Sequence, residues 1–362
     1  MIGTKSDSLV AKKHTIRTAR DDNAAQRREH SKRHHQKLWL PDQPGAWAMA
    51  LFPAIGGIVV GGVSWRNVWL TAAWTLCYCF QFSAARWLGV RAHEAKDVRK
   101  RHSTIYFVPA AVYLIITAIV GIPVFVFAPK LLWWIPAYAV LAVLSFWAAW
   151  KRSERTLWGN AVAVIAAGGM ALLSASLGSR FFVPAAPHER FTSRLSPVLA
   201  PNSAAATDPN SPAAVAVYQS NPLPGPHSAG LAQYYFSSPL LPKAGVIAAL
   251  AFILTEYASV LFVKTMIREH GHVGYYALSI GYHVLLVALG FTSPTLLRAA
   301  SGLALPRSTF ASTLLWGVPT VILLLRATIF PLTHKRMKPV HIGMIEAATS
   351  VMNLVVIALV LI

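Results

Sequence analysis

The chain has 362 residues, of which 55% are hydrophobic and 13% are charged, and its mean hydropathy is +0.49. This balance excludes an ordinary soluble domain and is typical of a protein that lies mostly in lipid. The formal net charge of +20 would suit nucleic-acid binding, but the basic residues lie between apolar runs, so we exclude that class.

The chain begins with a basic segment, residues 1–37, that lacks the apolar periodicity of a folded domain. We predict a disordered cytoplasmic tail, which directs topology and is attracted to anionic lipids by about 1 kcal/mol per basic side chain near the surface. The apolar run that follows is long enough to stay in the membrane, so the tail is not a cleavable signal.

Nine apolar segments are long enough to cross the hydrocarbon, which takes roughly 17 to 25 residues of helix. Because lipid offers no water to bare backbone groups, we predict an all-α, polytopic membrane helix bundle. The predicted spans are 46–63, 67–86, 104–128, 131–150, 157–178, 244–263, 274–291, 309–328 and 340–362. The stretch Thr295–Leu305 is short and contains Arg298, so we interpret it as a re-entrant or surface helix and not as a tenth span.

The basic residues predict the orientation, since Lys and Arg in short loops resist translocation. With the N-terminus inside, the cytoplasmic segments hold 25 of the 33 Lys and Arg residues. We therefore predict that the N-terminus lies in the cytoplasm and the C-terminus outside.

Residues 179–243 form a long polar interruption that holds 11 of the 23 prolines. This composition predicts a flexible extracytoplasmic linker. It divides the membrane part into helices one to five (38–178) and helices six to nine (244–362). In the second span, Cys77 and Cys79 point to different faces of one helix, so we predict no bridge between them.

Polar side chains inside the spans are the strongest functional signal, because they are costly in lipid. All of them lie in the predicted cytoplasmic half or near the midplane, about 6 to 14 Å deep at about 1.5 Å per residue. They are Gln81, Asn160, Glu256, His283 and Glu346. We predict one polar chamber that opens to the cytoplasm. Lys264, Arg268, Arg326 or His283 could pair the two glutamates, and a purely structural bridge that fixes helix register is the alternative.

Lys264 and Arg268 lie one turn apart at the cytoplasmic end of the sixth span. Two cations on one face suit a phosphate or carboxylate, and the alternative is that they are ordinary inside-facing positive charges. His270 and His272 are too few for a zinc site, so we predict no metal, and the sequence assigns no cofactor.

Three segments carry a family resemblance. They are LWLPDQPGAWAM (38–49), VKTMIRE (263–269) and HIGMIE (341–346). The chain resembles the YwiC-like family of bacterial membrane proteins from Leu38 onward, although that family usually has His in the place of Pro44. The resemblance implies the bacterial plasma membrane and no particular activity.

A second likeness concerns layout only. Nine helices with polar cytoplasmic loops after helices two and six are similar to the UbiA-type prenyltransferases, which hold Mg-diphosphate with Asp-rich motifs in those loops. Here the first loop offers only Glu94 and Asp97 among many bases, so a solvated basic loop is favoured over a magnesium site.

Three hypotheses follow. The first is an enzyme or binding protein with a cytoplasm-facing intramembrane site for an anionic amphipathic substrate, such as a lipid or isoprenoid phosphate. The second is a transporter for a small solute, in which prolines would break the spans. These prolines are Pro53, Pro123, Pro136 and Pro319. The third is a non-catalytic membrane partner of another complex.

Overall fold

The computed structural model describes residues 39–41, 44–93, 96–180, 241–301, 307–333 and 337–362. Within these ranges the chain forms nine α-helices, one short 3-10 helix and no β-strand. They are α2 (Pro44–Gly61), α3 (Trp65–His93), α4 (Lys96–Phe127), η1 (Pro129–Trp134), α5 (Ile135–Trp150), α6 (Leu157–Ser176), α10 (Lys243–Ile267), α11 (Val273–Ser301), α12 (Thr309–Thr333) and α13 (Pro339–Leu361). The all-α prediction is confirmed. The predicted tail and nearly all of the predicted linker lie outside the described residues.

Seven described helical segments are long and apolar enough to cross a membrane. They are Ser103–Phe127, Pro129–Trp150, Leu157–Ser176, Lys243–Ile267, Val273–Ala299, Thr309–Thr333 and Pro339–Leu361. The helix at Gly45–Gly61 is apolar but shorter, and α3 is long but carries more polar residues. The protein is therefore a multi-pass membrane protein. The side of the membrane on which each terminus lies remains a prediction.

Several helices extend beyond the predicted spans. α3 continues to His93 where the prediction ended at 86, and α12 continues to Thr333 where it ended at 328. An apolar run in the sequence marks only the part of a helix that lies in the hydrocarbon. The helix itself can continue into polar residues, because its backbone hydrogen bonds are made within the helix. Over its described part, Thr295–Leu305 is not a separate helix, because α11 runs on to Ser301.

Three of the four prolines that could break spans lie inside a helix. Pro53 lies inside α2, Pro123 inside α4 and Pro319 inside α12. Pro136 occupies the first turn of α5, where a missing backbone N–H costs nothing. The helices therefore run through three of these positions, and near Pro136 the chain changes from the 3-10 helix η1, which ends at Trp134, to α5, which begins at Ile135.

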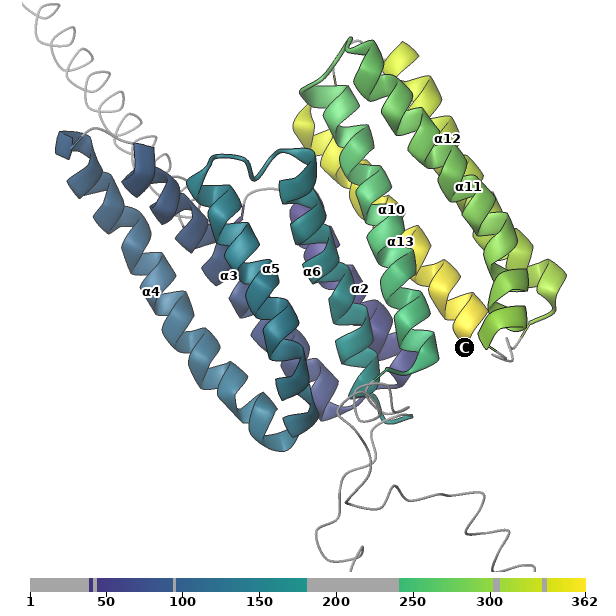
Figure 1. Cartoon of the computed structure of the whole chain (residues 1–362), viewed down its shortest axis with the longest axis horizontal. Coiled ribbons are helices and arrows are strands. Elements are labelled where there is room, and N and C mark those ends of the chain that lie inside the picture. Colours follow the sequence, from purple (N-terminus) through teal and green to yellow (C-terminus); the bar gives the residue numbers. More distant parts are fainter. Residues whose placement is uncertain (1–38, 42–43, 94–95, 181–240, 302–306, 334–336) are drawn as a thin grey trace, which may run out of the picture.

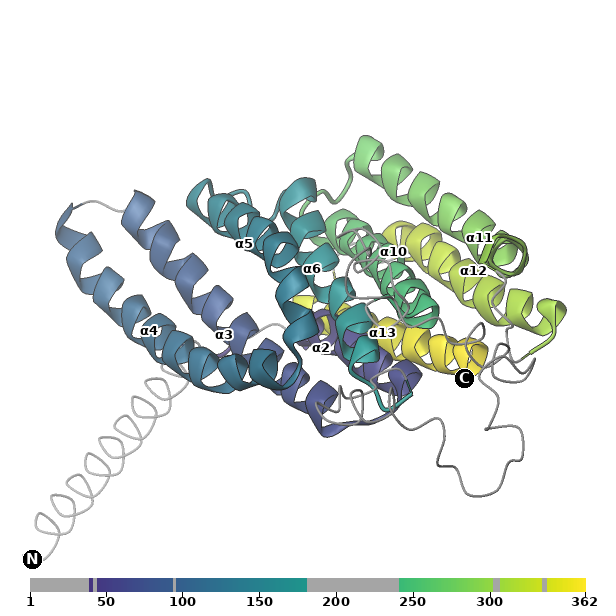
Figure 2. The ribbon, with the colours of Figure 1, turned by 60° about the horizontal axis from the view of Figure 1, so that its bottom comes forward.

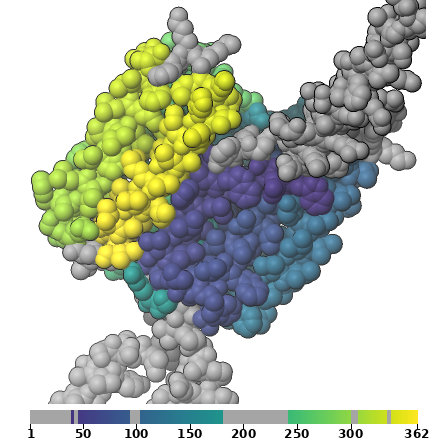
Figure 3. All heavy atoms as spheres, turned by 180° about the vertical axis from the view of Figure 1, so that it is seen from behind, coloured from purple at the N-terminus to yellow at the C-terminus, as the bar shows by residue number. Residues whose placement is uncertain are grey.

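Four helices form the centre of the bundle. α6 packs against α2 and α10, and α13 packs against the same two helices. α3, α4 and α5 lie on one side of this group, and α11 and α12 lie on the other (Figure 1 and Figure 2). From behind, α13 lies directly beside α2 (Figure 3). The two sets of helices on either side of residues 181–240 are thus joined through the central four.

Small residues allow the central helices to approach closely. Gly57 and Gly61, four residues apart on α2, face Ala171 and Ala175 of α6, and a Cβ on either glycine would overlap with the opposite backbone carbonyl. In membranes such small-residue pairs supply packing that apolar burial alone does not provide. In the adjacent helix α3, Cys77 and Cys79 are both free.

We call one end of the bundle the basic end. It carries the connection 151–156 between α5 and α6 and the connection 268–272 between α10 and α11 (top of Figure 1). Each helix crosses the bundle in turn, so α10 and α12 finish at this end, and α11 and α13 begin there. This end corresponds to the predicted cytoplasmic side.

Candidate functional site: a buried polar cluster in α10–α13

The helix α13 carries a stripe of buried polar side chains. They are Glu346, Thr349, Ser350 and Asn353. Spacings of three, four and seven residues place them on one helical face. The Asn353 amide donates to the Thr255 hydroxyl of α10 over 2.8 Å. This face therefore meets α10 through polar contacts as well as apolar ones.

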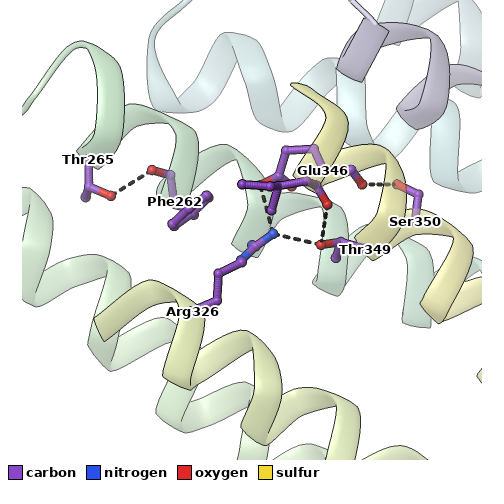
Figure 4. A network of polar contacts seen from close by, with 7 residues as sticks. Phe262, Thr265, Arg326, Glu346, Thr349 and Ser350 are labelled. Atoms are coloured by element: carbon purple, nitrogen blue, oxygen red, sulfur yellow. Dashed lines mark hydrogen bonds and ion pairs between the residues drawn. The ribbon is translucent and has the colours of Figure 1, made fainter. Parts of the chain in front are cut away.

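Arg326 of α12 forms a buried ion pair with this stripe. Its Nη1 lies 2.9 Å from Glu346 Oε1 and 2.7 Å from Thr349 Oγ1. The guanidinium also lies over the Phe262 ring of α10, with its carbon 4.1 Å from the ring centroid. Figure 4 shows Arg326 pointing at Glu346 and Thr349 across the gap between α12 and α13. The ring and the two hydrogen bonds hold the guanidinium in one orientation.

The ion pair leaves part of its hydrogen-bonding capacity unused. Arg326 Nε and Nη2 are buried and have no hydrogen-bond partner among the described residues. Nε and Nη2 lie on the same edge of the planar guanidinium, the edge that binds a carboxylate or phosphate with two parallel hydrogen bonds. An unpaired buried donor is costly, so this edge is the part of the ion pair that is chemically suited to bind an oxyanion.

His283 of α11 lies at the same level as Arg326. Leu286 of α11 packs with Leu323 of α12, and both residues lie one turn farther from the basic end than His283 and Arg326. Because α11 and α12 run antiparallel, this register brings residue 283 beside residue 326. The His283 ring is fully buried and lies within electrostatic range of the Arg326 guanidinium. Its Nδ1 is 2.7 Å from the Ser279 carbonyl oxygen.

Glu256 occupies a different face of α10. Phe252 meets Gly56 of α2, and Ile253 meets Gly168 of α6. Glu256 follows these two residues by one turn and so points toward the same two helices. Both of its carboxyl oxygens are buried without a hydrogen-bond partner in the described part of the chain. Glu256 is therefore buried, as an intramembrane carboxyl should be, but it does not share the ion pair of Arg326.

Lys264 and Arg268 contact the basic end instead of the ion pair. Lys264 Nζ donates to the Arg155 carbonyl oxygen over 2.7 Å, and Arg268 Nη1 donates to the same oxygen over 3.4 Å. They share one face of the chain at the end of α10, as their spacing predicts, and this face meets the loop between α5 and α6. In that loop, burial raises the pKa of the Glu154 carboxyl group, and the charges of Arg155 and Arg86 partly oppose the rise.

Two predicted site residues lie outside the cluster. Gln81 of α3 donates to the Ser145 hydroxyl of α5 over 3.0 Å, and Asn160 donates to the Thr156 carbonyl oxygen at the start of its own helix over 2.8 Å. Each has a local partner that accounts for its position. A direct contact thus joins Glu346 to Arg326, helix register places His283 at the same level, and Gln81 and Asn160 lie elsewhere.

Sequence reasoning assigned Arg326 only as a pairing partner and did not identify Thr349 or Asn353. Because the predicted span ended at residue 328, Arg326 stood two residues from its end, whereas α12 continues to Thr333. The polar spacing 346, 349, 350 and 353 was a readable signal. It marks one helical face, and side chains of that kind have no stable place against lipid.

The Thr255–Asn353 contact is expected to be a modest tie between α10 and α13. Interhelical hydrogen bonds in membranes contribute about 0.6 kcal/mol on average and up to about 1.7 kcal/mol. We expect Thr255→Val, Asn353→Leu and the double variant to yield a coupling free energy within that range, measured by equilibrium unfolding in detergent. A coupling of zero would contradict the contact.

The comparisons with known proteins concern the other half of the bundle. Residues 40–175 match the family model of YwiC-like proteins, which confirms the resemblance over α2–α6. The two resembling segments in α10 and α13 lie outside the matched residues. No solved structure matches the chain.

A curated protein of Haemophilus influenzae, described as an uncharacterized protein, is similar to part of the chain. It is 25% identical over 146 residues, which are 40% of this chain and 55% of that protein. The chain therefore spans about half the length of that relative. Neither comparison carries an activity, so the function of the α10–α13 cluster has to be argued from its geometry.

Proposed function

We propose that this protein binds the anionic group of an amphipathic ligand inside the bundle, with Arg326 as the residue that holds the anion. The observation that carries the proposal is the free edge of the guanidinium, formed by Nε and Nη2, which is buried and has no partner among the described residues. A planar, permanently charged fork matches the oxygens of a carboxylate or phosphate. The side chain is only 8% exposed, so an anion there would interact in a medium of low dielectric constant.

The surroundings of Arg326 support an amphipathic ligand over a free ion. Apart from Glu346 and Thr349, the guanidinium lies against the Phe262 ring, and Phe262 belongs to a buried apolar cluster with Ala327 and Ile342. Arg326 lies seven residues from the end of α12, which is about 10 Å from the basic end at about 1.5 Å per residue. A ligand whose charged group reaches Arg326 from that end would place an apolar part between helices.

The charges at the basic end support delivery from that side. Lys264 and Arg268 stand at the end of α10 that lies at the predicted cytoplasmic surface, the same end from which a ligand would approach Arg326. Clustered charges of one sign raise the local concentration of oppositely charged ligands. In this proposal the two side chains attract the anion and Arg326 binds it. The protein would lie in a bacterial plasma membrane, whose anionic lipids also attract the basic tail.

The test compares Arg326→Lys with Arg180→Lys in lipid nanodiscs, using octyl phosphate and octanoate as probes. Lysine keeps the charge and loses the two parallel donors, so we expect the affinity of Arg326→Lys to fall by about 10-fold to 100-fold, as for the loss of a hydrogen bond to a charged group. Arg180, which bonds to the Val60 carbonyl oxygen at the other end of the bundle, is the matched control. Equal affinities in the two variants would contradict the proposal.

A transporter is the second candidate, and Glu256 favours it. Ionisable side chains buried in membrane helices form the proton relays of pumps and transporters, and Glu256 lies among the central helices with both carboxyl oxygens free of described partners. The test is solute counter-flow into proteoliposomes. If the wild-type protein shows counter-flow and Glu256→Gln abolishes it, the transporter becomes the favoured function. Lipid extracts of a deletion strain, compared by mass spectrometry, would instead reveal a modified lipid if the ligand is a substrate.

A further inference from the structure

Two buried groups of the proposed site have hydrogen-bonding capacities of opposite kind. The free edge of Arg326 can only donate, because a guanidinium has no acceptor. His283 Nε2 is also buried without a partner in the described residues. Its capacity depends on which ring nitrogen carries the proton.

The contact of the other ring nitrogen fixes that choice. His283 Nδ1 lies 2.7 Å from the Ser279 carbonyl oxygen, and a carbonyl oxygen can only accept. Nδ1 therefore carries the proton and donates. In the neutral ring Nε2 is then unprotonated and acts as a hydrogen-bond acceptor. No donor among the described residues bonds to it.

The donor edge and the acceptor lie at one level of the α11–α12 interface. Leu286 and Leu323 pack together. His283 lies three residues from Leu286, and Arg326 lies three residues from Leu323, both in the direction of the basic end. Tyr282, next to His283, donates to the Leu254 carbonyl oxygen of α10 over 3.1 Å, which holds this part of α11 against α10. The Arg326 guanidinium acts electrostatically on the His283 ring, and a ligand between α11 and α12 at this level would lie near both side chains.

We propose that His283 selects a ligand whose anionic group also carries a proton, in the manner of a phosphate with a P–OH group. Two oxygens of the anion would accept from Arg326 Nε and Nη2, and the P–OH would donate to His283 Nε2. This inference rests on the proposed function, since it takes Arg326 as the anion site. It makes His283 a specificity-determining residue and narrows the ligand class from any anion to a protonated oxyanion.

Phosphate and sulfate separate this inference from the proposed function. Both are tetrahedral oxyanions, but at neutral pH inorganic phosphate carries at least one proton and sulfate carries none. We expect wild-type protein in phosphatidylcholine nanodiscs to bind radiolabelled phosphate about 10-fold to 100-fold more tightly than sulfate, because sulfate leaves the buried Nε2 unpaired. Equal affinity for the two anions would overturn the role of His283 and leave Arg326 as an anion site. Binding of neither would contradict the proposed function itself.

Two variants test the residue directly. In His283→Asn the side-chain amide can still donate to the Ser279 carbonyl oxygen, but the acceptor at the Nε2 position is lost. We expect this variant to bind phosphate and sulfate within about 3-fold of each other, with its affinity for sulfate unchanged. His283→Gln, which can place an amide oxygen near the Nε2 position, should keep part of the preference. A preference that survives His283→Asn would overturn the inference, and if neither variant folds, the wild-type ratio decides.

Lipids provide a second arm that identifies the source of the P–OH group. Phosphatidic acid carries a phosphate monoester, whereas phosphatidylglycerol carries a diester without a P–OH group. If a lipid headgroup is the source, phosphatidic acid in the nanodisc should compete with labelled phosphate and phosphatidylglycerol should not. Competition by neither lipid identifies a free phosphate compound as the ligand, and equal competition by both would overturn the selection by His283.

Discussion

Replacing Gly57 of α2 with leucine is expected to prevent correct assembly of the central helices. A Cβ at this position would overlap with the Ala171 carbonyl oxygen of α6, and backbone cannot move aside as a flexible side chain can. Overpacking a core costs about 1–3 kcal/mol and sometimes more, and here the whole α2–α6 pair has to separate. We expect most of the variant protein to be lost from the monodisperse peak after detergent extraction.

Gly121→Leu is the matched control for that experiment. Gly121 lies in α4, and a Cβ there would have nothing within 4 Å. Replacing a helical glycine without a clash should be neutral or favourable, by up to about 1 kcal/mol from helix propensity. Gly57→Ala should give an intermediate loss. If Gly57→Leu extracts as well as Gly121→Leu, the close approach of α2 and α6 is wrong.

Removing one partner of the Arg326–Glu346 pair is expected to destabilise the bundle strongly. The two side chains are 8% and 5% exposed, and breaking a buried pair leaves an uncompensated charge, which typically costs about 3–5 kcal/mol. We expect Glu346→Leu and Arg326→Leu each to lower the midpoint of thermal unfolding markedly. The destabilisation comes from the buried charge that is left without a partner. The lost attraction within the pair contributes little, because the cost of desolvating the two charges largely offsets it.

The double variant Arg326→Leu/Glu346→Leu separates structural from functional roles. Replacing a buried ion pair by apolar residues is often neutral or stabilising, so the double variant should recover most of the wild-type midpoint. It should still fail to bind octyl phosphate, because the guanidinium edge is gone. Recovery of both stability and binding would show that the pair only fixes helix register, the alternative that sequence reasoning left open.

Much of the architecture could be predicted because lipid imposes simple conditions. Apolar runs of sufficient length have to become helices, since bare backbone groups cannot be satisfied in hydrocarbon. Each of the nine predicted spans overlaps a described helix, although some helices extend further than predicted, as α3 does over Trp87–His93. The candidate residues Glu256, His283 and Glu346 stood out for the same reason, because polar groups in apolar runs need a buried place.

The sequence by itself determined that this protein is a helical membrane bundle whose inward-facing polar groups lie mainly in its second half. Only the tertiary structure decided which of them meet. In the packed bundle Glu256 faces α2 and α6. Lys264 and Arg268 donate to the Arg155 carbonyl oxygen. Arg326 pairs with Glu346. The physical reason is that spacing along one helix fixes only the face a side chain occupies, whereas its partner depends on how close packing rotates and shifts separate helices against one another.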